Sequence, residues 1–397
     1  MSLPKTGLIK HSSVMNNLEE IISSRIRDSG PITFAEFMEL ALYHPLYGYY
    51  SSGINRIGKE GDFYTSPHVH SAFGKVLGNF IVKSFDVIRE EKLTIIELGA
   101  GKGLLALDIL NHIKSNNTDY YDQSNYYIVE QSDRLQDESK KTLINHRHKI
   151  KWFSSLDELE NEKVTGVIIS NELIDAFPFH RAKFMSGNLS EIYVSVEDDE
   201  ITEVIGKPSS IELEEYFVHY DIHFKEGQEF EINLHAEKLL QKIDNILRKG
   251  FILTIDYGYL APQLFSPQRM KGTYKCIYKH AINETPYINI GEQDITAHVD
   301  FSNLIRAGES LKINKVQYTT QGQFLLDWGI LDLISGDIKK KSSPDSSFKK
   351  DIQAIKNLFL PELMGDRFKI LLQKKNLEIN HKNFYPESPF KISFNVL

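Results

Sequence analysis

The stretch LTIIELGAGKGLLALDIL, residues 93–110, decides the fold. It opens with an apolar run at 93–98 that predicts a buried strand, and apolar residues at helical spacing then predict a helix over 103–114. The turn between them contains Gly99, Gly101 and Gly103. A glycine-rich turn between a strand and a helix is typical of a ligand site at the carboxyl edge of a parallel sheet.

Three ligand classes compete for this turn. A phosphate-binding P-loop needs Ser or Thr after its Gly-Lys pair, but Gly103 follows Lys102, which excludes that class. A dinucleotide fingerprint needs its third glycine where Leu104 stands, so that interpretation is weakened and stays open. The remaining motif, Glu97 before the three glycines, is that of Rossmann-like methyltransferases that use S-adenosylmethionine. Glycines let the backbone approach this cofactor, and Glu97 can hold its ammonium group directly or through water.

A second carboxylate supports the same cofactor. Glu130 ends the strand candidate YYIVE at 126–130, 31 residues after Gly99. A carboxylate at the end of a strand can accept two hydrogen bonds from a ribose diol. The alternatives are that the glycines only pack a strand against a helix and that Glu130 is a solvated loop residue. The turn and Glu130 together favour S-adenosylmethionine over the carboxyl edge of the sheet.

The remainder of the chain predicts an α/β fold with a parallel sheet that helices cover on both faces. Further strands are expected at 149–153, 167–170, 251–257 and 367–375, further helices at 132–144 and 227–248, and an inserted hairpin at 191–206. Asp294 or Thr296 is expected to cap a later helix. The first 90 residues should be mainly helical, with Thr33 and Glu36 in a capping box, a helix at 71–88 and a largely irregular loop at 43–70.

The composition limits which partners, metal sites and locations are expected for the chain. The net charge of −8 over 397 residues argues against a nucleic-acid binder, because the phosphate backbone selects basic surfaces. A single cysteine, Cys276, excludes disulfides within the chain and a multi-cysteine zinc site. No apolar run is long enough to span a bilayer, and the first 20 residues lack an apolar or Arg-rich leader. These features predict a cytoplasmic protein.

The candidate residues for catalysis follow the strand at 167–170. There the sequence reads NELIDAFP and delivers Asn171, Glu172 and Asp175 to the carboxyl edge of the sheet. Methyl transfer is an in-line displacement, so the enzyme mainly positions the nucleophile and controls its protonation. If the nucleophile is an arginine, Glu172 and Asp175 could grip its planar guanidinium by paired hydrogen bonds. Asp256 reaches the same edge, although the three carboxylates could instead shape turns.

The segment GDFYTSPHVH, residues 61–70, precedes the helix at 71–88. It could form a lid over the cofactor, and Ser66 followed by Pro67 also has the pattern of a helix N-cap. His68 and His70 have no third ligand at recognisable spacing, so no metal site is expected.

Nearly the whole sequence resembles the MidA family of class I methyltransferases. The matching segments are GPITFAEFMELALYHPLYGYY (30–50), GDFYTSP (61–67), ELGAGKGLLALDIL (97–110), NELIDAFP (171–178), DYG (256–258), GTYKCIYKH (272–280), DITAHVDF (294–301) and MGDRFKIL (364–371). The family includes a mitochondrial complex I assembly factor that methylates an arginine. Two positions depart from the family pattern: His68 stands where an acid is common, and Phe179 where Val is common.

The resemblance implies a Rossmann-like class I methyltransferase with a seven-stranded, mostly parallel sheet. It implies a helical N-terminal region at 1–90 and a methyltransferase domain at 91–397 with insertions at about 185–226 and 259–310. It implies S-adenosylmethionine as donor and, from the mitochondrial member, symmetric dimethylation of an arginine in the 49-kDa-type subunit of complex I. By motif, the cofactor residues are Glu97, Gly99, Ala100, Gly101, Gly103, Glu130, Asn171, Gly61, Thr65, Ser66 and Pro67, and the catalytic residues are Glu172, Asp175, Asp256 and Asp62.

Three other functions stay open at this point. The chain could methylate another side chain or a small molecule, because the motifs show only a cleft lined with acids. It could be an assembly chaperone that binds the cofactor merely to stabilise its fold. An NAD oxidoreductase is disfavoured by the missing third glycine. The sequence indicates neither the oligomeric state nor the number of methyl groups that are added.

Overall fold

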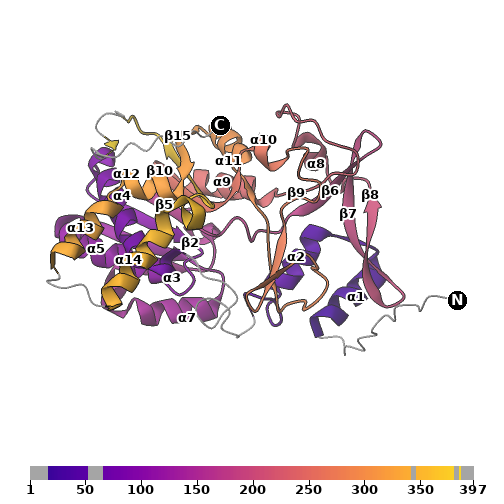
Figure 1. The fold of residues 1–397 in the computed structure, drawn as a ribbon, viewed down its shortest axis with the longest axis horizontal. Helices are drawn as coiled ribbons and strands as arrows, with labels where there is room; N and C mark the ends of the chain where they lie inside the picture. Colours follow the sequence, from indigo (N-terminus) through magenta and orange to yellow (C-terminus); the bar gives the residue numbers. More distant parts are fainter. Residues whose placement is uncertain (1–16, 52–65, 341–345, 380–383, 386–397) are drawn as a thin grey trace.

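The computed structural model describes residues 17–51, 66–340, 346–379 and 384–385. One large sheet has the strand order β15-β16-β10-β5-β2-β3-β4 (Figure 1). Its strands are β2 (Leu93–Leu98), β3 (Ser124–Val129), β4 (Ile150–Phe153), β5 (Val164–Asn171), β10 (Leu247–Tyr259), β15 (Ile313–Thr320) and β16 (Phe368–Lys375). Neighbours along this path are parallel except at β16, which is antiparallel to both β10 and β15. The predicted seven-stranded, mostly parallel sheet is confirmed, and the short β14 (Val299–Asp300) pairs with β10 beside it.

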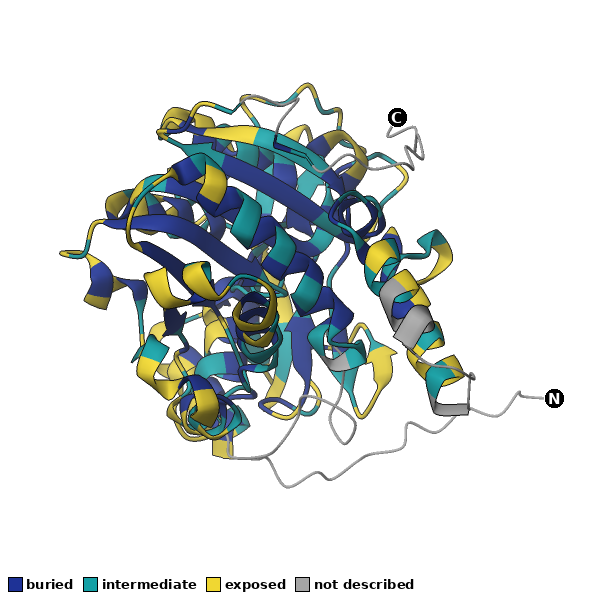
Figure 2. Cartoon of the chain, turned by 90° about the vertical axis from the view of Figure 1, so that its left-hand side faces the viewer, coloured by how far each residue is buried: buried dark blue, intermediate teal, exposed yellow. Residues whose placement is uncertain are grey.

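Two apolar layers cover the two faces of the sheet. Successive residues of β2 alternate between them, with Ile95 in one layer and Ile96 in the other. The helices of the first layer are α4 (Ala72–Ile88), α5 (Leu104–Asn116), α12 (Gln321–Asp327), α13 (Ile330–Lys340) and α14 (Ser346–Phe359), and those of the second are α9 (His235–Ile246) and α11 (Phe301–Ser310). Figure 2 shows the strands as a buried layer beneath helices whose outer faces are exposed.

A second, smaller sheet is inserted after β5. Its order is β1-β7-β6-β9, with β8 paired to β7, and it lies beside α1 and α2 on the opposite side of the molecule from α4 and α5 (Figure 1). The elements are α1 (Asn17–Ser29), β1 (Ile32–Thr33), α2 (Phe34–Tyr43), β6 (His180–Met185), β7 (Asn188–Glu197), β8 (Glu200–Gly206) and β9 (Glu229–Ile232). The hairpin predicted at 191–206 is therefore present as β7 and β8.

The remaining helical elements are short. They are α3 (Ser66–Val69), α6 (Thr118–Gln123), α7 (Asp133–Thr142), α8 (Ile211–Glu215), α10 (Ala261–Leu264), the 3₁₀ turns η1 (Ile144–Lys149) and η2 (Leu156–Leu159), and the π turn η3 (Pro361–Gly365). Strands β11 (Lys275–Tyr278), β12 (Ala281–Asn283) and β13 (Asp294–Thr296) form a third sheet. Among the described residues, no helix combines the length and the apolar character that crossing a bilayer requires.

The N-terminal helices pack in two different places. The predicted capping box is present at the start of α2, because Thr33 Oγ1 accepts from the Glu36 amide at 3.1 Å and Glu36 Oε2 accepts from the Thr33 amide at 3.0 Å. Phe34 of α2 stacks on Phe179 beside the inserted sheet, whereas α4 belongs to the layer on the large sheet. A domain boundary at about residue 90 stays a prediction.

Three local expectations differ from the structure. The helix expected at 227–248 begins only at His235, because Phe230 and Ile232 are buried on one side of the strand β9 that precedes it. Asp294 and Thr296 lie in β13, and the cap of α11 is Asp300, whose Oδ1 accepts from the Ser302 amide at 2.9 Å. The strand β15 was not predicted, since the sequence INKVQYTT has polar residues at most positions.

Candidate functional site

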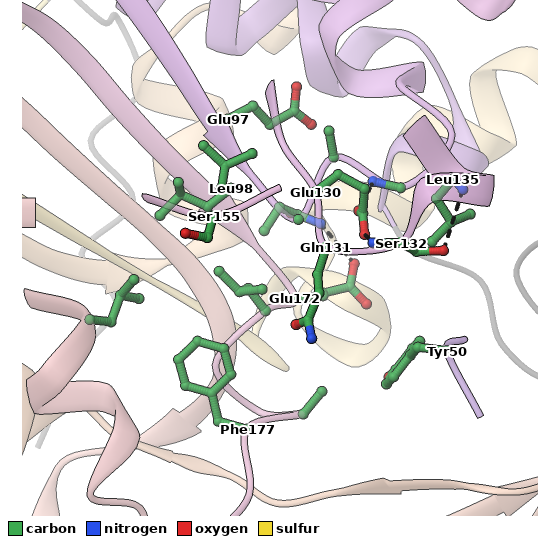
Figure 3. A pocket seen from close by; sticks show the side chains of 18 of the residues that line it. Tyr50, Glu97, Leu98, Glu130, Gln131, Ser132, Leu135, Ser155, Glu172 and Phe177 are labelled. Atoms are coloured by element: carbon green, nitrogen blue, oxygen red, sulfur yellow. Dashed lines mark hydrogen bonds between the residues drawn. The ribbon is translucent and has the colours of Figure 1, made fainter. Parts of the chain in front are cut away.

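A cavity of about 540 Å³ lies at the carboxyl edge of the large sheet, where β2 and β5 are neighbours (Figure 3). From β2 the chain continues through β3 and β4 on one side and returns to β5 on the other, and ligands bind at such a switch point. The lining comes from the segments after β2, β3, β4 and β5 and from α2 and α9. It includes Glu97, Gly99, Ala100, Gly101, Glu130, Ser132, Ser155, Leu156, Asn171, Glu172, Phe177, Tyr43, Tyr50, Glu39, Pro67, His235 and Lys238.

Gly101 is the position in the glycine turn that opens onto this cavity. Its φ is +53°, in the left-handed region, and a Cβ placed there would meet no protein atom within 4 Å. Gly99 and Gly103 differ, because a Cβ there would approach Leu173 and Leu143 to 2.9 Å. The alternative of glycines that serve packing thus applies to Gly99 and Gly103, whereas Gly101 leaves a space that a ligand can enter.

Glu130 joins the glycine turn to the segment after β3. Its Oε2 accepts from the Gly101 amide at 3.0 Å and its Oε1 accepts from the Ser132 amide at 3.0 Å. The side chain is buried, so it is not the solvated loop carboxylate of the alternative. Burial raises the pKa of Glu130, and the two amides oppose that rise. Each carboxylate oxygen retains a lone pair for a second donor, such as a ribose hydroxyl.

Glu97 is a second buried carboxylate on the cavity wall. Its Oε2 accepts from the Tyr126 hydroxyl at 2.5 Å, and burial raises the pKa of Glu97 to about 8. A nearby cation stabilises the ionised form of such a carboxyl group. The glycine opening and two carboxylates therefore suit a ligand that carries both hydroxyl groups and positive charge, as S-adenosylmethionine does.

Glu172 stands at the end of β5 in a strained conformation. Its φ is +52°, which is uncommon for a residue with a side chain, and its amide donates to Ile255 O at 2.9 Å. Its Oε1 accepts from Asn171 Nδ2 at 3.1 Å and from the Ser66 amide at 3.2 Å. Burial, followed by the charge of Asp175, raises the pKa of Glu172 to about 8. Strain of this kind costs about 1–3 kcal/mol and persists where neighbours over-determine the backbone.

Asp256 holds that turn through hydrogen bonds from its backbone amides. Its Oδ2 accepts from the amides of Leu173, Ile174 and Asp175 at 3.3, 2.9 and 3.3 Å. Asp175 Oδ2 accepts from Thr296 Oγ1 at 2.8 Å, and Asp175 borders a separate cavity of about 20 Å³. Asp175 and Asp256 are not among the described residues that line the main cavity. Of the four polar residues predicted at this edge of the sheet, only Asn171 and Glu172 line it.

The predicted lid segment is described only in part. Gly61, Asp62 and Thr65 lie outside the described residues. Pro67 lines the cavity, and the Ser66 hydroxyl donates to Gln321 Oε1 at 3.1 Å. Ser66 thus connects α3 to α12 through its side chain and to Glu172 through its amide.

Sequence reasoning missed the part of the wall that comes from distant segments. Tyr43 and Tyr50 lie at the end of α2 and in the turn after it, and Ser155 and Leu156 follow β4. Ser155 and Leu156 could have been predicted, because every parallel strand places the residues that follow it at the same edge of the sheet. The tyrosines carry no comparable signal, since only tertiary packing brings them to the cavity.

The cofactor fits the groups that face the cavity. The space above Gly101 would be filled by a Cβ, and the Oδ1 atom of Asn171 is buried with no hydrogen-bond donor among the described residues. An amino group of a ligand would satisfy that atom. Glu97, Glu130 and Asn171 thus offer acceptors for a cationic, hydroxylated molecule.

Curated relatives are mitochondrial enzymes. The human protein arginine methyltransferase NDUFAF7, mitochondrial, is 26% identical over 394 residues, which cover 92% of this chain and 82% of the human protein. The Caenorhabditis elegans homologue is 28% identical over 323 residues, 73% of this chain and 71% of that protein. The expectation of a cytoplasmic location is contradicted by these names. It rested on the single cysteine and the first 20 residues, and a lack of disulfides does not distinguish one reducing compartment from another.

A solved structure and a family model agree with the site. A COG1565 superfamily protein from Burkholderia thailandensis bound to S-adenosyl-homocysteine is similar with a TM-score of 0.81 and 26% identity, over 91% of this chain and 92% of that one. Residues 76–319 match the model of a family described as S-adenosyl-L-methionine-dependent methyltransferases. The resemblance to MidA methyltransferases is confirmed. The chain belongs to this family of S-adenosyl-L-methionine-dependent methyltransferases.

Proposed function

We propose that this methyltransferase transfers methyl groups to an arginine of a protein, and that the protein is the 49-kDa-type subunit of respiratory complex I in mitochondria. The observation that supports an arginine acceptor is Glu172, a half-buried carboxylate that a strained turn holds in the same cavity as the glycine turn. The arginine methyltransferase names of the relatives support the reaction, and the MidA resemblance supports the complex I subunit.

The cofactor site is proposed from the lining residues. Gly99, Ala100 and Gly101 would form the turn on which the cofactor lies, and Gly103 would complete that turn outside the lining. Glu130 would accept from the ribose, and Glu97 and Asn171 would face the amino-acid end of the cofactor. Pro67 would cover it, with Ser66 holding that segment to Glu172. When bound, S-adenosylmethionine supplies an electrophilic methyl group on a sulfonium.

Glu172 would orient the acceptor and take its proton. A carboxylate with a pKa of about 8 ionises readily when a guanidinium replaces the water around it. Its free oxygen can then accept from the nitrogen that forms the new bond to carbon, and the N–H proton leaves to that oxygen. We assign Asp175 and Asp256 to positioning, because their oxygens hold the turn that carries Glu172. A role for Asp62 stays a prediction.

The test is label transfer from methyl-tritiated S-adenosylmethionine into a mitochondrial lysate that lacks this protein, followed by mass spectrometry of the labelled polypeptide. We expect one labelled polypeptide with dimethylarginine, identified as the 49-kDa-type subunit, and strongly reduced label with the Glu172→Gln variant. Dimethylarginine on a different protein would reject the complex I subunit. Label on another side chain or a small molecule would reject the arginine, and cofactor binding without transfer would indicate a chaperone.

A further inference from the structure

Two stacked tyrosines line the cavity beside the turn at residues 171–178, which is called the acidic turn because it carries Glu172 and Asp175. The rings of Tyr43 and Tyr50 have centroids 5.5 Å apart and planes that differ by 26°. The Tyr43 hydroxyl donates to Ala176 O at 2.9 Å, and the Tyr50 hydroxyl donates to Asp294 Oδ1 at 2.8 Å. Each hydroxyl proton is used in holding its ring in place. What the pair can offer to a ligand is therefore aromatic surface.

Tyr50 lies at the end of the cavity away from Glu97. In Figure 3, Tyr50 and Phe177 lie on two sides of Glu172, and Glu97 is at the opposite end of the view. Tyr43 bonds to Ala176, four residues beyond Glu172 in the same turn. The pair thus belongs to the acceptor side of the site and not to the glycine turn.

The same end of the cavity is anionic. Burial and the charges of Asp294 and Glu39 raise the pKa of the Tyr43 hydroxyl well above its ordinary value, so the ring stays neutral in an acidic field. Glu39 and Glu172 both line the cavity. The lysines among the described lining residues are Lys102, Lys238 and Lys242, which come from the glycine turn and α9 rather than from α2 or the acidic turn.

We propose that Tyr43 and Tyr50 form an aromatic platform that binds the flat face of the acceptor guanidinium while Glu172 and Glu39 accept from its edges. The proposal rests on the proposed function and names the residues that select arginine over lysine. A guanidinium is planar and weakly hydrated, so it stacks on an aromatic face, whereas an ammonium is a compact, strongly hydrated charge. A neutral aromatic platform between carboxylates therefore favours the planar guanidinium of arginine over the compact ammonium of lysine.

The test uses two synthetic ligands that differ in one group. Both are adenosine derivatives with the same 5′ tether, one ending in a guanidinium and the other in a primary ammonium. Calorimetry gives their Kd values and that of S-adenosylhomocysteine. For the unaltered protein we expect the guanidinium ligand to bind about 10-fold more tightly than its ammonium twin. Equal affinities would overturn the platform.

Variants of Tyr50 test whether the preference for the guanidinium ligand comes from the Tyr50 ring. Tyr50→Leu should remove the preference while the affinity for S-adenosylhomocysteine changes by less than about twofold, and Tyr50→Phe should keep it, because the ring remains. Tyr47→Leu is the matched control, since Tyr47 lies in the same segment, stacks on His44 and is not among the described lining residues. A preference that survives in Tyr50→Leu, or that is lost in Tyr50→Phe, would overturn the proposal.

The two proposals fail differently. If the unaltered protein binds S-adenosylhomocysteine and labels arginine but does not prefer the guanidinium ligand, the platform is wrong and the proposed function stands. If it prefers neither ligand and labels another kind of nucleophile, the proposed function is wrong as well. If Tyr50→Leu no longer binds S-adenosylhomocysteine, the same comparison is made in Tyr50→Met, for which the same loss of preference is expected.

Discussion

Gly101 is the residue whose substitution separates cofactor binding from folding. Gly101→Val places a branched side chain in the open space above the turn, and we expect the affinity for S-adenosylhomocysteine to fall at least about 100-fold. Gly187→Val is the control, because Gly187 has a similar φ of +77°, has open space around it and lies in the turn between β6 and β7. Both variants bear a similar backbone strain of about 1–2 kcal/mol.

Calorimetric titration and thermal unfolding of the two variants make the comparison. We expect similar losses of Tm, and a loss of binding in Gly101→Val alone. Unchanged affinity in Gly101→Val would mean that the cofactor does not approach the turn at this residue.

Glu172 should give the reaction its pH dependence. Since burial raises its pKa to about 8, the free enzyme carries mostly the protonated form at neutral pH, and only the ionised form binds a guanidinium. We therefore expect kcat/KM for the protein acceptor to rise with pH and to level off above about pH 8. Glu172→Gln should reduce transfer about 100-fold or more, abolish this rise and leave the Kd of S-adenosylhomocysteine within a few-fold.

Rates of label transfer between about pH 6 and pH 9 test this assignment. Glu97 also has a pKa raised to about 8, so the glutamine variant of Glu172 is needed to attribute the rise. If the residual activity of Glu172→Gln still rises through the same pH range, the titrating group is not Glu172.

At the scale of elements, the acidic turn is fixed by segments from across the chain. Asp256 of β10 accepts from three of its amides, Tyr43 of α2 donates to Ala176 O, and Asn233 Nδ2, before α9, donates to Ile174 O at 3.1 Å. The Ala297 amide donates to Asp175 O at 3.0 Å. This network explains how Glu172 keeps its positive φ.

Asp256→Asn tests whether that network supports catalysis. The amide side chain has one acceptor oxygen and presents an N–H₂ group to backbone donors. We therefore expect the free energy of unfolding, measured with urea, to be lower by about 1–3 kcal/mol. Transfer should fall more than cofactor affinity, because the turn and not the glycine segment is loosened. Asp198→Asn, at an exposed position between β7 and β8, is the control. A full transfer rate in Asp256→Asn would show that the turn does not need this carboxylate.

The elements that could be predicted from the sequence are those with a local signal. The apolar run of β2 is buried on both faces, and the capping box before α2 lies within four residues. By contrast, β15 lies at the edge of the sheet and has the burial pattern of a polar strand. Its place depends on pairing with β16, which no local pattern specifies.

The candidate site divides in the same way. Because parallel strands place their carboxyl ends at the same edge of a sheet, the sequence predicted that Glu97, Glu130 and Glu172 lie together at that edge. It could not give the direction of each side chain, and Asp256 turns toward backbone amides instead of the cavity. Nor could it find Tyr50, whose position depends on tertiary contacts such as the hydrogen bond from its hydroxyl to Asp294, far along the chain.

For the whole molecule, buried carboxyl groups should make stability fall as pH rises. Burial raises the pKa of Glu97 and Glu172 from the ordinary value of 4.5 to about 8, and it also raises the pKa of Asp175. Between about pH 4.5 and pH 8 these carboxyl groups therefore hold more protons in the folded state than in the unfolded state. Unfolding then releases protons, so the free energy of unfolding decreases with increasing pH.

Urea unfolding of the ligand-free protein at several pH values measures this decrease. A cationic cofactor beside Glu97 should lower its pKa, so binding near pH 7 should release protons, which calorimetry in two buffers detects. Glu97→Gln is expected to reduce that release. A free energy of unfolding that stays constant or increases with pH across this range would contradict the assignment of the pH dependence to these carboxyl groups.

The pairing of β1 with β7 has a consequence for the order in which the protein is made. Ile32 lies opposite Val194, so the N-terminal strand receives its partner only after some 160 further residues have been added. At a synthesis rate of about 5–20 residues per second, this interval is roughly ten to thirty seconds. Throughout it, Phe34 and Phe37 of α2 lack the strands that later bury them. Helix α2 can thus reach its native packing only after the inserted sheet has been synthesised.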